Sequence, residues 1–146
     1  GLRDMDWIYT WYNSSGINDG GAAGYGDTGS GTTTEIRVVG SDNCEDSSRC
    51  DTEKFVTDVN SVGLCGASDW RLPTVMELVS IANLNRYSPA IDTDYFPNTP
   101  SSNFWSGSPF AGFSDSAGMV DSIHGYASVN VNRQNRGHVR LVRDGL

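Results

Sequence analysis

The side chains that could carry out catalysis are few in this chain. A hydrolytic triad needs a nucleophile, an imidazole base and a group that orients the base. The sequence has two histidines, His124 and His138, and no serine stands in the Gly-x-Ser-x-Gly pattern of a nucleophile elbow. Asp92 and Asp94 form a carboxylate pair, but closeness in sequence does not give two carboxylates the separation that a glycosidase needs. We therefore predict that the protein is not an enzyme.

Two acidic clusters are the candidate metal sites. Asp92-Thr93-Asp94 begins like a calcium-binding loop, but Phe96 and Pro97 interrupt the series of oxygen ligands. The second cluster consists of Asp42, Asn43, Glu45 and Asp46. A solvated turn explains either cluster. We predict no metal and no cofactor, and a structural calcium ion stays open as the alternative.

The three cysteines, Cys44, Cys50 and Cys65, lie in one stretch of the chain. A zinc site normally needs a fourth ligand, and both histidines are far away in the sequence. One disulfide with one remaining thiol is the better interpretation, and it favours an oxidising compartment. A straight helix between Cys50 and Cys65 would hold their backbones too far apart, so Cys44 is the better partner for one of them.

Composition limits both the class of protein and its partners. The length of 146 residues fits one domain, and the 17 glycines predict long loops rather than a helical bundle. The net charge of -8 argues against a nucleic-acid partner held by bulk electrostatics. No apolar run reaches membrane-spanning length. Because the sequence begins at Gly1 without a methionine, we expect membrane attachment only through an anchor that precedes Gly1.

Two helices are predicted in the middle of the chain. Asp51 or Thr52 caps the first, which runs to about Val62 and ends at Gly63. The predicted apolar stripe of this helix consists of Phe55, Val56, Val59 and Val62.

The second helix follows the segment Asp69–Thr74. Thr74 and Glu77 have the spacing of a capping box, so we expect the helix to begin at Val75 and to end near Leu84. Trp70 is too large to leave in water at low cost, and we expect it to anchor a core. The predicted buried side of the helix consists of Met76, Leu78, Val79, Ile81 and Ala82.

Short strands are predicted towards both ends. Residues 7–12 are rich in β-formers, with Trp7, Tyr9 and Trp11 on one face. Residues 103–106 have the pattern of a buried strand, and residues 138–143 suit a core strand with its arginines facing outwards or paired. This order predicts a single α+β domain over residues 1–146. Its parts are a strand and glycine-rich loop (1–43), a helical half (44–84) and a half with the sheet and binding loops (103–146).

Several motifs together resemble a known family. Trp70-Arg71-Leu72-Pro73-Thr74, Phe104-Trp105-Ser106 and the terminal Val139-Arg140-Leu141-Val142-Arg143 are similar to motifs in the C-terminal domain of the Legionella collagen-like adhesin, a bacterial extracytoplasmic domain. The resemblance implies a C-type-lectin-like fold, with two helices packed on a small twisted antiparallel sheet with long irregular loops. It also implies a secreted or cell-surface-anchored protein that binds a ligand and is not catalytic. The residues assigned to the scaffold are Trp70, Arg71, Pro73, Trp105 and Arg140.

A narrower resemblance concerns residues 117–140. In some members of that family, this stretch is the variable region of a diversity-generating retroelement, which mutates adenines in asparagine-type codons. Val120, Gly125 and Arg133 stand where the fixed frame would be. The positions that the resemblance marks as ligand-binding are Met119, Asp121, Ile123, His124, Tyr126, Ala127, Ser128, Val129, Asn130, Val131, Asn132, Gln134, Asn135 and Arg136.

The composition of this stretch supports a binding surface independently of the family. Residues 121–137 show neither a clean strand alternation nor a helical stripe, and they interleave apolar side chains with amides and an arginine. That mixture suits an adaptable recognition surface; an ordinary exposed hairpin is the competing interpretation. We expect a protein or glycan ligand on another cell, a phage or a host surface. The alternatives are a constitutive glycan-binding adhesin domain and a trimerising cap of a surface protein.

Overall fold

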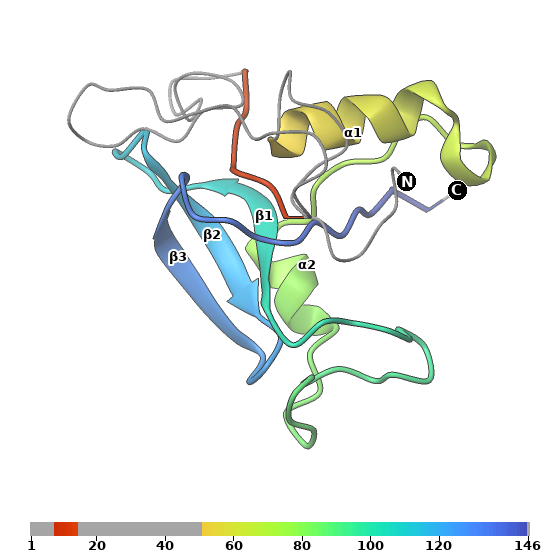
Figure 1. Cartoon of the computed structure of the whole chain (residues 1–146), viewed down its shortest axis with the longest axis vertical. Helices are drawn as coiled ribbons and strands as arrows, with labels where there is room; N and C mark the ends of the chain where they lie inside the picture. Colours follow the sequence, from red (N-terminus) through yellow and green to blue (C-terminus); the bar gives the residue numbers. More distant parts are fainter. Residues whose placement is uncertain (1–7, 15–50, 146) are drawn as a thin grey trace.

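The part of the chain that the structure describes folds into two short helices and one three-stranded antiparallel sheet, which confirms the predicted α+β class (Figure 1). The computed structural model describes residues 8–14 and 51–145. The helices are α1 (Thr52–Ser61) and α2 (Val75–Ser80), with a 3-10 turn at Leu64–Gly66 between them. The strands β1 (Asn103–Pro109), β2 (Ser116–Asp121) and β3 (Tyr126–Asn132) follow in that order across the sheet. The lectin-like assignment remains a prediction.

Helix α1 begins and ends where its sequence predicts. The side chain of Asp51 accepts a hydrogen bond from the Lys54 backbone at 2.8 Å and caps the helix. Gly63 takes a left-handed conformation (φ +61°) just after the helix, which glycine adopts without strain. Val59 is buried, whereas Val62, expected on the apolar stripe, is exposed.

Helix α2 is shorter than predicted, because it ends at Ser80 rather than near Leu84. Its predicted capping box is present: the Thr74 hydroxyl accepts from the Glu77 backbone, and Glu77 accepts from the Thr74 backbone. Leu78 packs on the sheet, but the predicted burial of Met76 is wrong, since Met76 is 74% exposed. Positions three and four residues apart share a helix face, so Val75, Leu78 and Val79 face the sheet and Met76 does not.

Both faces of the central strand β2 are covered. On one face, Leu78 of α2 packs with Phe104 and Val120. On the other, Trp11, Trp105, Ala117 and Met119 form a second cluster. The indole of Trp105 donates to the Tyr9 carbonyl at 2.8 Å, and the indole of Trp11 donates to the Ser106 carbonyl at 2.9 Å. These bonds join the first described segment to the sheet.

Two predicted strands are wrong in form. In the described part of residues 7–12, only two isolated bridges occur, from Tyr9 to Gly137 and from Thr10 to Asp51. Residues 138–143 likewise form bridges instead of a strand: His138 pairs with Phe104 and Val142 with Arg71. Because the segment pairs first with Phe104 and then with Arg71, it forms no continuous ladder of hydrogen bonds with either neighbour. Trp7 lies outside the described residues.

Of the three cysteines, Cys65 lies among the described residues. Cys65 has a free, exposed thiol, so it is not half of a disulfide. Cys44 and Cys50 lie outside the described residues, as does the acidic cluster at residues 42–46, and a bond between these two cysteines stays a prediction. In the described ranges, no helix has the length and apolar character to cross a membrane.

Candidate recognition surface

Strand β3 and the turns at its two ends hold most of the positions predicted to bind ligand. We call the side chains of residues 121–136 that reach solvent the β3 face. β3 is an edge strand, because β2 is its only neighbour in the sheet of the described residues. Figure 1 shows β3 on the outer side of the sheet.

Nine of the predicted positions are exposed and four are half-buried. The exposed ones are His124, Tyr126, Ala127, Ser128, Val129, Asn130, Asn132, Asn135 and Arg136. The half-buried ones are Asp121, Ile123, Val131 and Gln134. They lie on consecutive parts of one turn–strand–turn unit, so the structure brings them together.

Met119 is the exception, and it does not belong to the β3 face. Its side chain is 2% exposed and packs with Trp11 and Trp105 in the core. The reason is its position on the central strand: β2 is covered on both faces, whereas on β3 Val131 packs against the cluster of Trp11 and Trp105 and the rest of the strand is exposed. A residue of β2 therefore cannot share the exposure of its partner in β3.

The three positions of the expected fixed frame are all buried. Val120 packs with Leu78 and Phe104. Gly125 (φ +82°) ends the turn before β3, where an added Cβ would lie 3.1 Å from the Cβ of Ala82. Arg133, after β3, is buried, and its backbone donates to the Asp115 carbonyl at 2.8 Å and accepts from Trp11 at 3.0 Å. Both ends of β3 are thus fixed by residues that do not face solvent.

A β-bulge divides the β3 face. Met119 pairs with Ser128 and Ala117 with Val131, so β3 has one more residue than β2 between these pairs. The position opposite the bulge is Gly118, where an added Cβ would lie 2.6 Å from Val75 Cγ2 and 2.8 Å from Ser106 Oγ. Val129 and Asn130, which oppose Gly118, are both exposed.

An aromatic cluster occupies the end of the β3 face near Asp121. The rings of His124 and Tyr126 lie nearly parallel, with centroids 5.9 Å apart. Tyr87 contacts His124 edge to face at 5.2 Å. Sequence reasoning missed Tyr87, which is 70% exposed, because it comes from an irregular segment and meets His124 only in the folded chain.

Asp121 orients the imidazole of this cluster. Its Oδ2 lies 2.7 Å from His124 Nδ1. Partial burial would raise the pKa of Asp121, but the hydrogen bonds from His124 and from the Ile123 backbone outweigh that effect and hold the pKa below its usual range. Asp121 is the only hydrogen-bond partner of His124 among the described residues. The pair therefore resembles the base and orienter of a triad without the nucleophile.

The described residues hold no group of three or more histidine, cysteine, aspartate or glutamate side chains that could bind a metal ion. Asp92, the first residue of the calcium-like segment, is engaged in a turn. Its Oδ1 accepts from the Asp94 backbone at 3.1 Å and lies 3.5 Å from Arg86. Both contacts are those of an ordinary surface turn.

The residues expected to form the scaffold lie away from the β3 face or beneath it. Trp105 and Pro73 are fully buried. Trp70 is half-buried, and its indole donates to the Leu64 carbonyl at 3.0 Å. Arg71 binds both carboxylate oxygens of Glu77 at 2.9 Å. Arg140 lies on a different surface, where it lines a pocket.

Comparison with known proteins gives one match. The Lcl C-terminal domain family model matches residues 6–143 of the chain. The search of curated proteins and the search of solved structures gave no match. The matched range contains the segment Asp69–Thr74, the whole β3 face and the terminal motif at residues 139–143.

Proposed function

The chain belongs to the Lcl C-terminal domain family, and from that premise we propose that it is a non-catalytic, ligand-binding domain of an extracytoplasmic protein, with the β3 face as its recognition surface. Membership indicates an adhesin-related domain. The ligand is a protein or a glycan on another surface. The side chains that bind this ligand are those of the β3 face, and Met119 is not one of them.

The observation that carries this proposal is the pattern of exposure along residues 120–136. Val120, Gly125 and Arg133, the frame positions, are buried. The positions between them reach solvent in part or in full, except Ser122, which is buried. A stretch organised in this way can change its outer side chains with little cost in packing. This is the property that a diversified binding surface needs.

The chemistry of the β3 face also suits binding. Tyr126 is 67% exposed and Val129 is 51% exposed, so both offer apolar contact area to a partner. The amides of Asn130, Asn132 and Asn135 supply donors and acceptors around them. Large exposed aromatic groups with adaptable amides are typical of paratopes.

The binding experiment uses the labelled chain on a glycan array and on an array of extracellular proteins. Tyr126→Ala should lower the affinity for every ligand found by about tenfold or more, because it removes an exposed anchor. Tyr95→Ala is the matched control, since Tyr95 is an exposed tyrosine outside the β3 face. Binding that survives Tyr126→Ala and fails with Tyr95→Ala would place the recognition surface elsewhere.

Diversification is a separate part of the proposal and has its own test. The gene should lie beside a reverse transcriptase and a near-copy of the segment coding for residues 117–140. The two copies should differ almost only at adenines of the near-copy. If the genome lacks such a pair, the β3 face is a constant surface, and ligands restricted to glycans would then favour a constitutive adhesin.

A further inference from the structure

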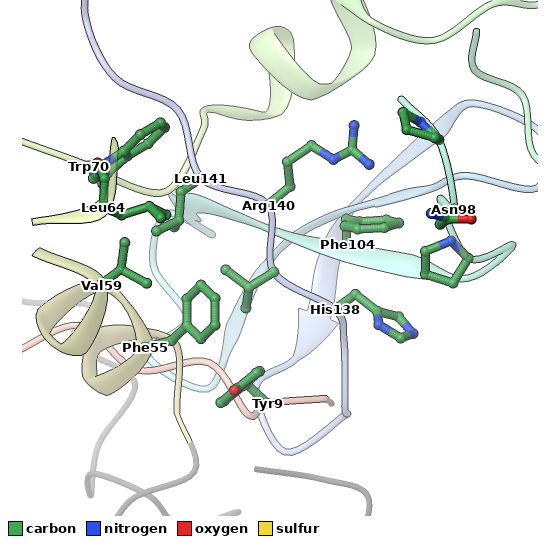
Figure 2. A pocket seen from close by; sticks show the side chains of 13 residues that line it. Tyr9, Phe55, Val59, Leu64, Trp70, Asn98, Phe104, His138, Arg140 and Leu141 are labelled. Atoms are coloured by element: carbon green, nitrogen blue, oxygen red, sulfur yellow. The ribbon is translucent and has the colours of Figure 1, made fainter. Parts of the chain in front are cut away.

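A concave surface lies away from the β3 face, between α1, the loop at residues 97–100 and the terminal segment 138–141. It is a pocket of about 380 Å³, a size at the lower end of small-ligand sites. None of its lining residues belongs to the β3 face. Figure 2 shows Trp70, Leu64 and Val59 at one end, and Arg140, Asn98 and His138 towards the other. The pocket is therefore apolar at one end, and its polar side chains lie towards the other end, beside Phe104.

Among the described residues that line this pocket, Arg140 is the one arginine or lysine. Its guanidinium donates to the Thr99 hydroxyl at 2.8 Å. It also lies over the rings of Phe96 and Phe104, at 4.8 Å and 5.4 Å from their centroids. Its pKa is lowered by burial, which removes part of the hydration of the charged form. An arginine nevertheless stays protonated in proteins.

No carboxylate among the described residues pairs with Arg140. This differs from three other arginines: Arg71 pairs with Glu77 and Asp144, Arg86 with Asp92, and Arg143 with Asp69. The chain has 18 acidic and only 10 basic residues, so carboxylate partners are abundant. A half-buried cation without one loses hydration and gains no opposite charge in return.

We propose that this pocket binds a small apolar molecule through its carboxylate, which pairs with the guanidinium of Arg140. The guanidinium has one hydrogen bond to protein and further N–H groups available for a bidentate pair. The apolar body of the ligand lies against the side chains of Phe55, Trp70 and Leu141. Such a carboxylate occurs both in a free organic acid and at the C-terminus of a peptide that ends in an apolar residue.

The test is a titration of the ¹⁵N-labelled full chain with phenyl-substituted acids from benzoate to 4-phenylbutyrate, each beside its neutral amide. At least one acid should shift the resonances of residues 138–141 and of the Trp70 indole. That acid should bind about tenfold more tightly than its amide, because the amide lacks the charge-assisted pair. Equal affinities of acid and amide, or no shifts with any acid, would overturn the proposal.

Variants of Arg140 test whether its charge is the cause of the preference for the acid over the amide. Arg140→Met should abolish the preference for the acid, and Arg140→Lys should retain part of it because a charge remains. Arg86→Met is the matched control and should bind as the wild type does, since Arg86 pairs with Asp92 and is not part of the pocket. Thermal unfolding of each variant checks that it is folded. If Arg140→Met does not fold, the comparison of acid with amide on the wild type still decides the question.

The source of the carboxylate is distinguished with peptides. A tripeptide that ends in phenylalanine is compared with its C-terminal amide in the same titration. If the peptide acid binds more tightly than every free acid, the pocket takes a peptide C-terminus. If only the free acids bind, it takes a small organic acid. The β3-face variant Tyr126→Ala should bind the acids normally, so a failure of this proposal is separate from a failure of the proposed function.

Discussion

Arg71 and Val142 exchange both of their backbone hydrogen bonds, each with an N···O distance of 2.9 Å. This pair joins the motif at residues 70–74 to the terminal motif at residues 139–143. Arg71 and Val142 are 71 positions apart in the sequence. The Arg71 side chain adds an ion pair with Asp144 at 2.7 Å, and Arg143 lies 3.6 Å from Asp69. The chain terminus is thereby tied to the start of α2.

Because of the ion pair between Arg71 and Glu77, the thermal stability of the protein should depend on pH in the acid range. The hydrogen bond from Arg71 is the main reason that the pKa of Glu77 falls from 4.5 to about 2. When the pKa of a carboxyl is lower in the folded state than in the unfolded state, its ionised form stabilises the fold. This stabilisation is complete at pH values above the pKa of the unfolded state, and it is lost as the pH falls to the pKa of the folded state. The melting temperature of the wild type should therefore drop between pH 4.5 and about 2.

Glu77→Gln tests that expectation, because it removes the titrating group and keeps the shape. Its melting temperature should be lower than that of the wild type at pH 7 and should change less over the same acid range. Asp144→Asn leaves the Arg71–Glu77 pair in place and should keep most of the wild-type slope. Equal slopes for wild type and Glu77→Gln would show that the pair does not control acid stability.

Trp105 should be a stronger anchor of the fold than Trp70. Trp105 is 0% exposed and its indole is hydrogen-bonded to Tyr9, whereas Trp70 is only half-buried. We expect Trp105→Ala to lower the free energy of unfolding by about 3–5 kcal/mol. Trp70→Ala should cost less, because less surface returns to water. Urea unfolding measures both, and a larger loss for Trp70→Ala would contradict this ranking.

Gly118 should tolerate no side chain. An alanine Cβ there would approach Val75 Cγ2 to 2.6 Å, and both groups belong to packed elements. We expect Gly118→Ala to lower the free energy of unfolding by about 1–3 kcal/mol through overpacking. Gly145→Ala is the control, because an added Cβ there has open space. Similar stabilities of the two variants in urea would mean that α2 can shift away from the sheet.

Local features of this fold were predictable from sequence, and contacts between distant segments were not. The capping box of Thr74 with Glu77 and the stop at Gly63 depend on neighbouring residues alone. The burial of Met119 depends on its position in a central strand and on Trp11, which lies far away in the chain. The contact of Tyr87 with His124 has no sequence signal at all.

The residues of the candidate site show the same difference between features that the local sequence predicts and features that depend on contacts between distant segments. The resemblance marked the stretch as ligand-binding, and that role stays a prediction; the frame residues Val120, Gly125 and Arg133 are buried, and most positions between them reach solvent. The failure at Met119 arises because β2 and β3 differ in coverage, which one sequence cannot reveal. The terminal segment misled the strand prediction because its backbone forms a bridge to Phe104 at His138 and another to Arg71 at Val142, instead of pairing with one neighbour throughout.

Met119 and Ser128 are direct partners across β2 and β3, and they offer the sharpest test of the boundary between scaffold and β3 face. Met119→Asn places an amide among Trp11 and Trp105 and should lower the free energy of unfolding by about 2–5 kcal/mol. Ser128→Asn makes a substitution to the same residue at an exposed site and should change stability by less than about 0.5 kcal/mol. Chemical unfolding of the two single variants and of the double variant measures these effects. A stable Met119→Asn would return Met119 to the recognition surface, and an unstable Ser128→Asn would remove β3 from it.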